Sequence, residues 1–293
     1  MDIKDKLKEF IQEMKLNELT ERTLKKYESD INQFIKEANI SNIDQLKKES
    51  LIEYKSIIQE KYKTASINNK ITIINKFIDY LNLPELKLKQ IKQQKKTSLE
   101  NVLNESDYNR LLRLAERLGK IRTLYIMKTL AGTGIRIDEL KYITVEAIKK
   151  GYTQVENKGK IRDIIISKNL SKELKSYCKE QDIKEGILFA SNTGKPLDKA
   201  YIWRELQYIA GQARVRKDKV HAHSFRHLFA KTYLRDGGNI THLADLLGHS
   251  SLDTTRIYTM QTKDEHRAIL DSQEEARKKQ GRKQGKTELK GGV

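Results

Sequence analysis

Residues 86–103, LKLKQIKQQKKTSLENVL, interrupt a chain that is otherwise patterned mainly as helices. The stretch has no acid before Glu100 and is rich in lysine: Lys87, Lys89, Lys92, Lys95 and Lys96. A segment with so many like charges and so few apolar side chains buries little surface, which predicts a basic linker over residues 89–103. The 293 residues suffice for a folded domain on each side of it. Two separately folded domains are therefore expected.

The part before the linker, residues 1–88, has the periodicity of amphipathic helices. One apolar stripe follows Thr20, which is placed as an N-cap, and another follows Thr64. The stripes are Leu24, Tyr27, Ile31, Phe34 and Ile35, then Ile67, Ile71, Ile74, Phe77, Ile78 and Leu81. Less regular helices are expected at residues 3–14 and 50–62. The pattern predicts a four-helix domain with basic outer faces.

The part after the linker, residues 104–276, is predicted to be helical except for one hairpin, YTQVENKGKIRDIIIS, which turns at residues 157–160. Helices are expected at residues 105–119 with Asn104 as N-cap, then at 120–132, from 136, and at 171–181, 198–213, 224–235, 240–247, 252–258 and 263–279. The predicted fold class is mainly α with a small β-sheet (α+β). Residues 277–293 hold seven Lys or Arg against one Glu, and we expect a basic, mobile tail.

The net charge of +18 favours a polyanionic partner, although solvated lysine faces alone also raise a net charge. Lys92, Lys95 and Lys96 then fit a strap along a DNA backbone, the alternative being a solubilising tether. The single cysteine, Cys178, excludes an intramolecular disulfide. The start, MDIKDKLKEF, lacks the apolar centre of a signal peptide, and no run reaches the roughly 20 apolar residues of a membrane span. We therefore expect a cytoplasmic protein.

Arg136 lies in AGTGIRIDEL, where two glycines allow a tight turn before the next predicted helix. A helix start of this kind receives a phosphate well. Glu139, three residues later, is close enough to orient the guanidinium. An ordinary surface ion pair is the alternative.

His223 and Arg226 lie one helical turn apart and project from one face. Two planar guanidiniums, Arg136 and Arg226, can bind the oxygens of one phosphate and stabilise a pentacoordinate transition state. Lysines lack this fork. His227 falls on another side of the helix and is interpreted as a structural histidine.

Lys158 stands at the tip of the predicted hairpin, where a lysine can reach a DNA groove and protonate a leaving 5′ oxygen. Lys160 and Arg162 compete for that place and are DNA-binding candidates; a merely charged hairpin tip is the alternative. Tyr258 is the candidate nucleophile, and its hydroxyl needs a base or adjacent positive charge to lose its proton. His223, His249 and the two arginines provide both, although core packing is the usual reason for a tyrosine in a helix.

The segments TGIRIDEL, HSFRH and LGHSSLDTTRIY resemble, in order and spacing, the three conserved boxes of the tyrosine recombinase, or phage integrase, family. The resemblance covers roughly residues 104–271, and residues 1–88 are similar in size and character to the family's core-binding domain. The architecture looks like the compact Xer-like branch, and an arm-binding domain of the lambda integrase kind is not expected.

This resemblance implies a role for each motif residue. Arg136, Lys158, His223, Arg226, His249 and Tyr258 would be catalytic, with Tyr258 as nucleophile and Glu139 in support. The hairpin turn is one residue shorter than the usual Xer-like form, which leaves Lys160 as an alternative to Lys158. A 3′-phosphotyrosine intermediate keeps the bond energy, so the family's chemistry requires no ATP, metal or other cofactor. The implied partners are double-stranded DNA and further copies of the chain, as a tetramer on DNA, with an accessory DNA-bending protein left open.

Two other classes fit parts of the sequence. Residues 237–258 can form a helix-turn-helix, which predicts a non-catalytic DNA-binding regulator but leaves Arg136 and Lys158 without a role. A type IB topoisomerase uses similar chemistry to relax supercoils. The length of the chain and the form of its boxes favour a site-specific recombinase of the kind that integrates mobile genetic elements, resolves cointegrates or separates chromosome dimers.

Overall fold

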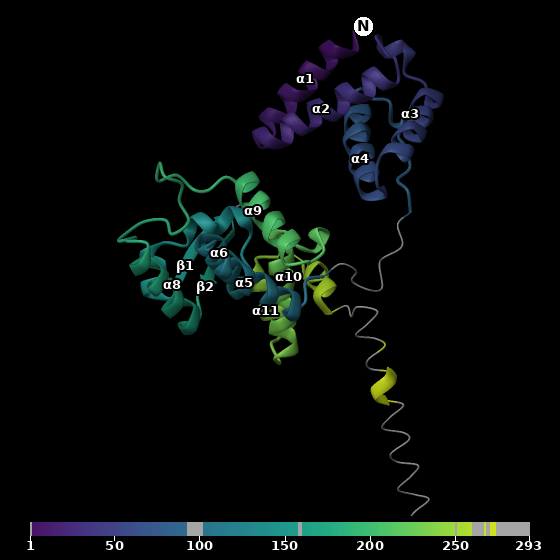
Figure 1. The fold of residues 1–293 in the computed structure, drawn as a ribbon. Helices are drawn as coiled ribbons and strands as arrows, with labels where there is room; N and C mark the ends of the chain where they lie inside the picture. Colours follow the sequence, from purple (N-terminus) through teal and green to yellow (C-terminus); the bar gives the residue numbers. More distant parts are fainter. Residues whose placement is uncertain are drawn as a thin grey trace, which may run out of the picture. The chain divides into compact units, whose positions relative to one another are not determined.

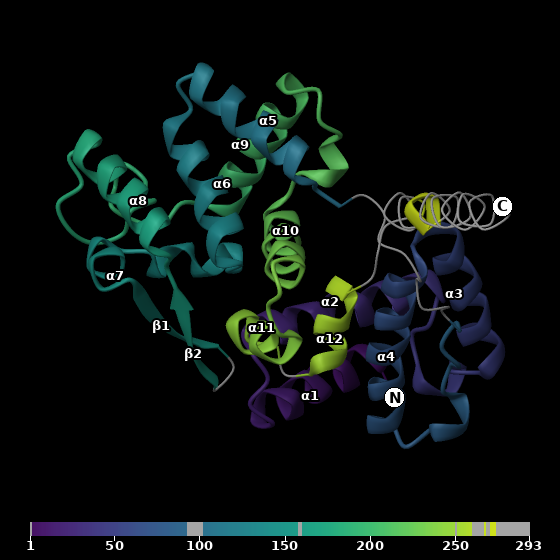
Figure 2. The same cartoon turned by 90° about the horizontal axis from the view of Figure 1, so that it is seen from below.

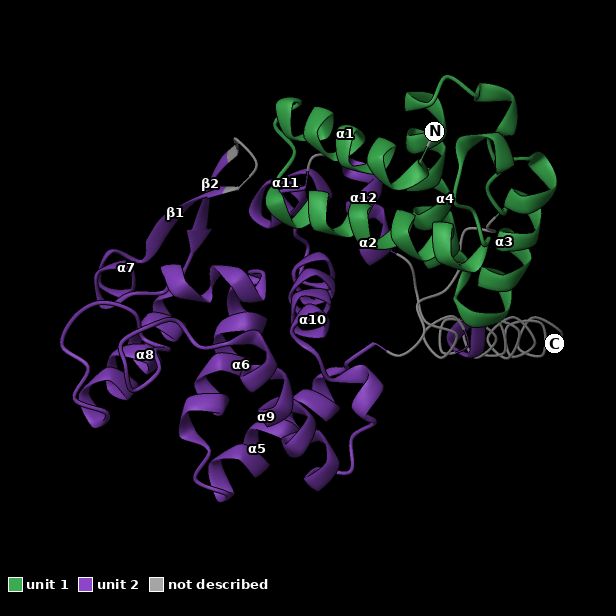
Figure 3. Ribbon diagram, turned by 90° about the horizontal axis from the view of Figure 1, so that it is seen from above, with its two compact units in different colours: residues 1–95 green, residues 96–293 purple. Residues whose placement is uncertain are grey.

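The computed structural model describes residues 2–92, 102–157, 160–249, 251–259, 267 and 270–273. The chain divides into two compact units, Met1–Lys95 and Lys96–Val293, which Figure 3 colours separately. In the described residues, no helix is both long enough and apolar enough to cross a membrane.

Unit 1 contains the helices predicted for the N-terminal part. They are α1 (Ile3–Leu16), α2 (Glu21–Glu37), α3 (Lys48–Lys61) and α4 (Thr64–Tyr80), with short 3-10 turns at Ile43–Gln45 and Pro84–Leu86. Thr20 caps α2 as predicted, since its hydroxyl accepts the Thr23 amide hydrogen. Phe10, Phe34 and Phe77 are buried in a common core, as expected from the apolar stripes.

A buried ion pair crosses this core. Lys70 of α4 contacts Asp30 of α2 at 2.8 Å, and the two side chains are only 7% and 3% exposed. Lys70 also donates a hydrogen bond to Gln33, 2.7 Å away. The buried ammonium of Lys70 therefore has a carboxylate and an amide oxygen as partners where apolar side chains surround it.

The start of the lysine-rich stretch, from Leu88 to Ile91, packs against α4 and the rest of the core of unit 1. Asn75 of α4 donates to the Leu88 carbonyl and accepts its amide hydrogen, and Asn68 does the same for Ile91, at 2.8–2.9 Å. Leu88 is buried and Ile91 partly buried in the same core. The lysine-rich composition did not predict this packing. The apolar residues alternate with charged ones, and the partners of the backbone are the amide side chains of Asn68 and Asn75.

Unit 2 is helical around the central α6 (Ile121–Thr133), which contacts α5 (Glu105–Arg117), α8 (Lys168–Glu180), α9 (Lys199–Gln212) and α10 (Ala222–Arg235). Shorter elements follow in the order of the chain. They are a 3-10 turn at Ile137–Tyr142, α7 (Val145–Lys150), a 3-10 turn at Lys217–Lys219, α11 (Ile240–Leu247), α12 (Leu252–Arg256) and a 3-10 turn at Ile257–Thr259. Figure 1 labels most of these elements.

The predicted hairpin is confirmed. Strands β1 (Tyr152–Asn157) and β2 (Lys160–Ile165) pair antiparallel, from Tyr152 opposite Ile165 to Asn157 opposite Lys160. Val155 and Ile164 point into the core, as the period of two requires. The hairpin extends from α7 in Figure 2, and β2 contacts α11.

Several local expectations were wrong. The segment from Arg136 forms a 3-10 turn, and Tyr258 also lies in a 3-10 turn instead of an α-helix. Helix α8 begins at Lys168 because Ser167 caps it, three residues before the predicted start. Helix α7 was not predicted, since six residues give no periodicity to detect. The helix expected at residues 263–279 falls mostly outside the described residues.

Candidate active site

Arg226 is the centre of the site and is almost fully buried, with 1% of its surface exposed. It lies on α10, which begins after His221 because that imidazole accepts the Ser224 amide hydrogen. The guanidinium donates to the carbonyls of Gly134, at 2.8 Å, and Leu247, at 2.6 Å. Burial and the nearby charge of Arg136 lower the pKa of Arg226 to about 10, so it stays cationic at neutral pH.

Arg136 lies two residues after Gly134, at the C-terminal end of α6. Helix α6 ends at Thr133, and Gly134 follows with φ +64°; a Cβ there would lie 2.4 Å from the Phe229 ring, so only glycine fits. The chain then delivers Arg136, whose Nη1 donates to Glu139 at 3.1 Å and whose Nη2 donates to the Gly248 carbonyl at 3.2 Å. Glu139 also accepts the backbone amide hydrogen of Arg136 at 2.7 Å. The predicted pairing of the two residues is present.

The C-terminal turn of α11 receives three arginines. The carbonyls of Leu246, Leu247 and Gly248 accept hydrogen bonds from Arg162, Arg226 and Arg136, respectively. The last carbonyls of a helix lack partners within the helix and carry partial negative charge. The three guanidiniums supply those partners and are fixed by them in return.

His249 follows this turn and completes the link between α11 and α12. Its Nε2 lies 2.9 Å from Nη2 of Arg226, and its Nδ1 lies 2.8 Å from the hydroxyl of the buried Thr255. Burial, followed by the charges of Arg226 and Arg136, lowers the pKa of His249 to about 4. The imidazole is therefore neutral at pH 7.

Tyr258 lies in the same cluster as the predicted imidazoles. Its side chain is buried, and its ring stacks on His249 with 6.0 Å between centroids. It also interacts with Arg226, and this contact partly opposes the lowering of that arginine's pKa. The structure thus brings together Arg136, Arg226, His249 and Tyr258.

His227 also belongs to this cluster, which the sequence analysis missed. Its ring packs edge-on against Tyr258 at 4.8 Å and against His223 at 4.7 Å. Burial, followed by the charge of His223, lowers the pKa of His227 to about 4, and burial also lowers the pKa of His223. The sequence analysis placed His227 on another side of the helix from His223 and Arg226. Its contact with Tyr258 depends on a later segment of the chain, so the pattern of α10 alone did not predict it.

Two family models match the chain. The model of the phage integrase family matches residues 101–265, and the model of the phage integrase N-terminal SAM-like domain matches residues 7–83. The chain belongs to the phage integrase family. It is a tyrosine site-specific recombinase that acts on DNA, as the three boxes predicted.

Curated relatives support this assignment over most of the chain. The tyrosine recombinase XerD of Listeria innocua is 27% identical, with 84% of this chain and 90% of that protein covered. The tyrosine recombinase XerA of Pyrococcus furiosus is 28% identical, with 87% and 89% covered. The predicted Xer-like character is confirmed.

Solved structures agree with the fold. A crystal structure of the XerA recombinase is 26% identical and matches 92% of this recombinase and 98% of that chain, with a TM-score of 0.52. A lambda integrase tetramer bound to a Holliday junction is 18% identical and matches 88% and 77%, with a TM-score of 0.73. The second likeness concerns the fold alone.

The structure describes only some of the remaining predicted site residues of this recombinase. Lys158 lies outside the described residues, as do Lys95, Lys96 and the side chain of Lys160, while Lys92 is exposed. Arg162 points inward from β2 and has a side chain only 9% exposed. It contacts Glu139 at 2.6 Å. Among the described residues, no group of three or more His, Cys, Asp or Glu side chains is arranged to hold a metal ion.

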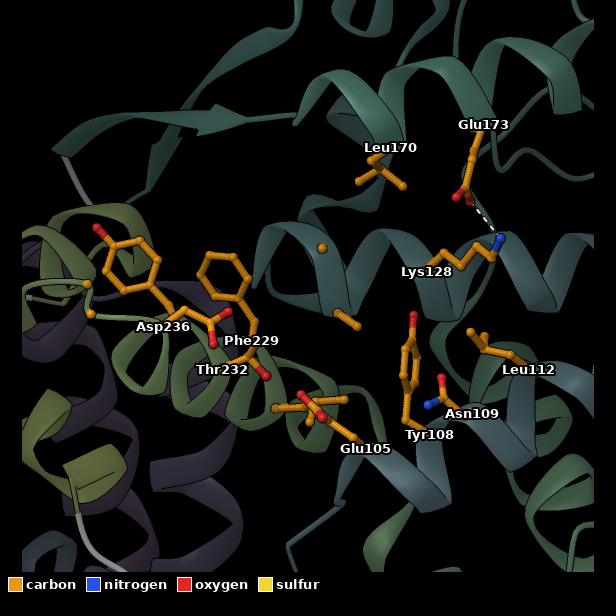
Figure 4. Close-up of a pocket in the computed structure, with 16 residues that line it drawn as sticks. Glu105, Tyr108, Asn109, Leu112, Lys128, Leu170, Glu173, Phe229, Thr232 and Asp236 are labelled. Carbon is orange, nitrogen blue, oxygen red and sulfur yellow. Dashed lines mark hydrogen bonds and ion pairs between the residues drawn. The ribbon is translucent and has the colours of Figure 1, made fainter.

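A separate groove of about 930 Å³ lies elsewhere in unit 2 (Figure 4). Tyr108, Leu170 and Phe229 line it, and Lys128 pairs with Glu173 at its edge, 2.6 Å apart. Its lining includes neither arginine of the cluster nor Tyr258. The groove is therefore distinct from the candidate active site.

Proposed function

We propose that this recombinase cuts and rejoins DNA at one phosphodiester held by Arg136 and Arg226, with Tyr258 as the nucleophile. The observation that carries the proposal is the anchoring of both guanidiniums to adjacent carbonyls, those of Gly248 and Leu247. This spacing directs two cationic forks toward one position beside His249 and Tyr258. A phosphate placed there meets donors that need no reorganisation as negative charge develops.

In the proposed cleavage step, the Tyr258 oxygen forms a bond to phosphorus and the bond from phosphorus to the 5′ oxygen breaks. The Tyr258 proton passes to an imidazole, either His249, whose ring stacks on Tyr258, or His223. The pKa of His249, lowered to about 4, leaves that imidazole neutral and able to accept the proton, and burial lowers the pKa of His223 as well. Lys158 donates a proton to the leaving 5′ oxygen, with Lys160 as the alternative.

The products are a 3′-phosphotyrosine and a free 5′ hydroxyl. Attack by a 5′ hydroxyl of a second duplex reverses the step and joins the strands in a new arrangement. The covalent intermediate keeps the energy of the phosphodiester, so the exchange proceeds without ATP. We extend the proposal to four copies of the chain on two duplex sites, since exchange of four strands needs four nucleophiles.

A nicked suicide duplex tests the chemistry, because loss of the short strand traps the covalent complex. The target duplex is obtained first by selecting bound and cleaved DNA from a genomic pool. The wild type is expected to form an adduct released by protease, and Tyr258→Phe to bind DNA but form none. An adduct in Tyr258→Phe would contradict the assignment. Joining of two separate duplexes, as opposed to relaxation of a supercoiled plasmid alone, distinguishes recombinase from topoisomerase.

A further inference from the structure

Arg162 differs from the other arginines of the site in the element that carries it. It projects from β2, not from a helix, and its Nη2 donates to Glu139 Oε2 at 2.6 Å. Its Nη1 donates to the carbonyl of Leu246. With both ends of the guanidinium engaged inside the protein and the side chain only 9% exposed, the residue is not presented as a surface cation.

We propose that Arg162 is a positioning residue that ties the β1–β2 hairpin to the phosphate-binding arginines through Glu139 and the end of α11. This inference rests on the proposed function of Arg136 and Arg226. It gives Arg162 a role inside the protein in place of direct DNA contact.

The first part of this role is electrostatic. Glu139 is 4% exposed and bonds both Arg136, through Oε1, and Arg162, through Oε2. A carboxylate paired with Arg136 alone would cancel its charge and weaken its attraction for a phosphate. Because Arg162 shares the carboxylate, the three groups keep a net positive charge while Arg136 keeps its orientation.

The second part is geometric. A Cβ on Gly248 would lie 2.5 Å from Cδ of Arg162, so the arginine stem passes directly over this residue. Gly248 has φ +63° and supplies the carbonyl that holds Arg136. A shift of Arg162 is therefore transmitted to the carbonyl that orients Arg136.

Single-turnover cleavage of the suicide duplex and equilibrium DNA binding at several salt concentrations test the proposal together. Arg162→Met is expected to slow cleavage about 100-fold, the cost of a small displacement at a reacting centre. Its DNA affinity and the slope of log K against log salt should match the wild type. The cleavage rate of Arg162→Lys should fall between those of the wild type and Arg162→Met, because a lysine keeps the charge but cannot bridge Glu139 and Leu246.

A direct phosphate contact gives the opposite result. It would lower the salt slope by about 0.9 and leave cleavage of the bound complex unchanged, which would overturn the proposal. Arg122→Met is the matched control, since Arg122 is half-buried against Tyr177 in the same unit. Arg122→Met should change neither the cleavage rate nor the salt slope of DNA binding. Melting curves of each variant exclude unfolding as the cause, and Arg162→Lys remains informative if Arg162→Met does not fold.

Two further measurements separate this proposal from the proposed function. Glu139→Gln should slow cleavage less in the Arg162→Met background than in the wild type, because the two residues act as a unit. Independent, multiplying effects would count against the coupling. Urea unfolding of the DNA-free protein needs no cleavage: because Arg162 contacts Glu139 at 2.6 Å, the losses of unfolding free energy in Arg162→Met and Glu139→Gln should be non-additive. Additive losses overturn the proposal even if the wild type forms no adduct.

Discussion

Arg226 donates a hydrogen bond to Nε2 of His249 at 2.9 Å, and this contact fixes the tautomer of the histidine. A guanidinium has no acceptor, so Nε2 must carry the lone pair and Nδ1 the proton. That proton is directed to the hydroxyl of Thr255, 2.8 Å away. The basic nitrogen of His249 therefore faces the proposed phosphate, and a phosphate that takes over the arginine donor releases this nitrogen for proton transfer.

Thr255 is accordingly predicted to orient the base. Thr255→Val keeps the shape of this fully buried side chain but removes the acceptor for Nδ1. We expect single-turnover cleavage to fall about tenfold, equivalent to the loss of one hydrogen bond of about 1.4 kcal/mol, with DNA affinity unchanged. Thr255→Ser retains the hydroxyl and should stay near the wild-type rate. Equal losses in both variants would point to packing instead.

The neutral histidines predict how stability depends on pH. His227 and His249 have pKa values lowered to about 4, whereas an unfolded histidine titrates near 6.5. Between these values the unfolded chain binds more protons, so stability should decrease as pH falls from about 6.5 to about 4. Urea midpoints across this range measure the effect. His227→Asn should flatten the profile, whereas substitution of the exposed His242 by Asn should not.

Gly248 is predicted to be required for two separate reasons. Its φ of +63° disfavours any side chain, and a Cβ would also collide with the Arg162 stem at 2.5 Å. Gly119 is a matched control, because it has φ +65° with nothing within 4 Å of a Cβ. Gly119→Ala should cost about 1 kcal/mol of unfolding free energy, and Gly248→Ala about 2 kcal/mol more with loss of cleavage. Equal costs, measured by urea unfolding, would exclude the steric contribution.

The sequence was most informative where chemistry requires one residue type at one spacing. The boxes around Arg136, Arg226 and Tyr258 predicted residues from separate helices and turns that the structure brings to one cluster. Thr20 and Asn104 predicted helix starts because a cap is a local hydrogen bond, independent of the rest of the fold.

What the sequence did not predict depends on contacts between distant segments. The inward direction of Arg162 is set by the carbonyl of Leu246, more than eighty residues away, and no local pattern records it. The packing of Leu88 likewise depends on Asn75 of α4, which bonds its backbone. His227 shares a helix with Arg226, yet its partner Tyr258 comes from a later segment.

The two lysines on Asp30 give a final prediction about the stability of unit 1. Both contact the carboxylate at 2.8 Å, but the Lys26 side chain is 57% exposed and the Lys70 side chain only 7%. An exposed pair contributes less than about 1 kcal/mol, because water and salt screen it. Breaking the buried pair costs about 3 kcal/mol, since the partner's charge stays in the core. Lys70→Ala should therefore lower the urea midpoint several times more than Lys26→Ala, and 1 M salt should reduce only the smaller effect. Comparable losses in the two variants would show that the buried position of Lys70 adds nothing to its interaction with Asp30.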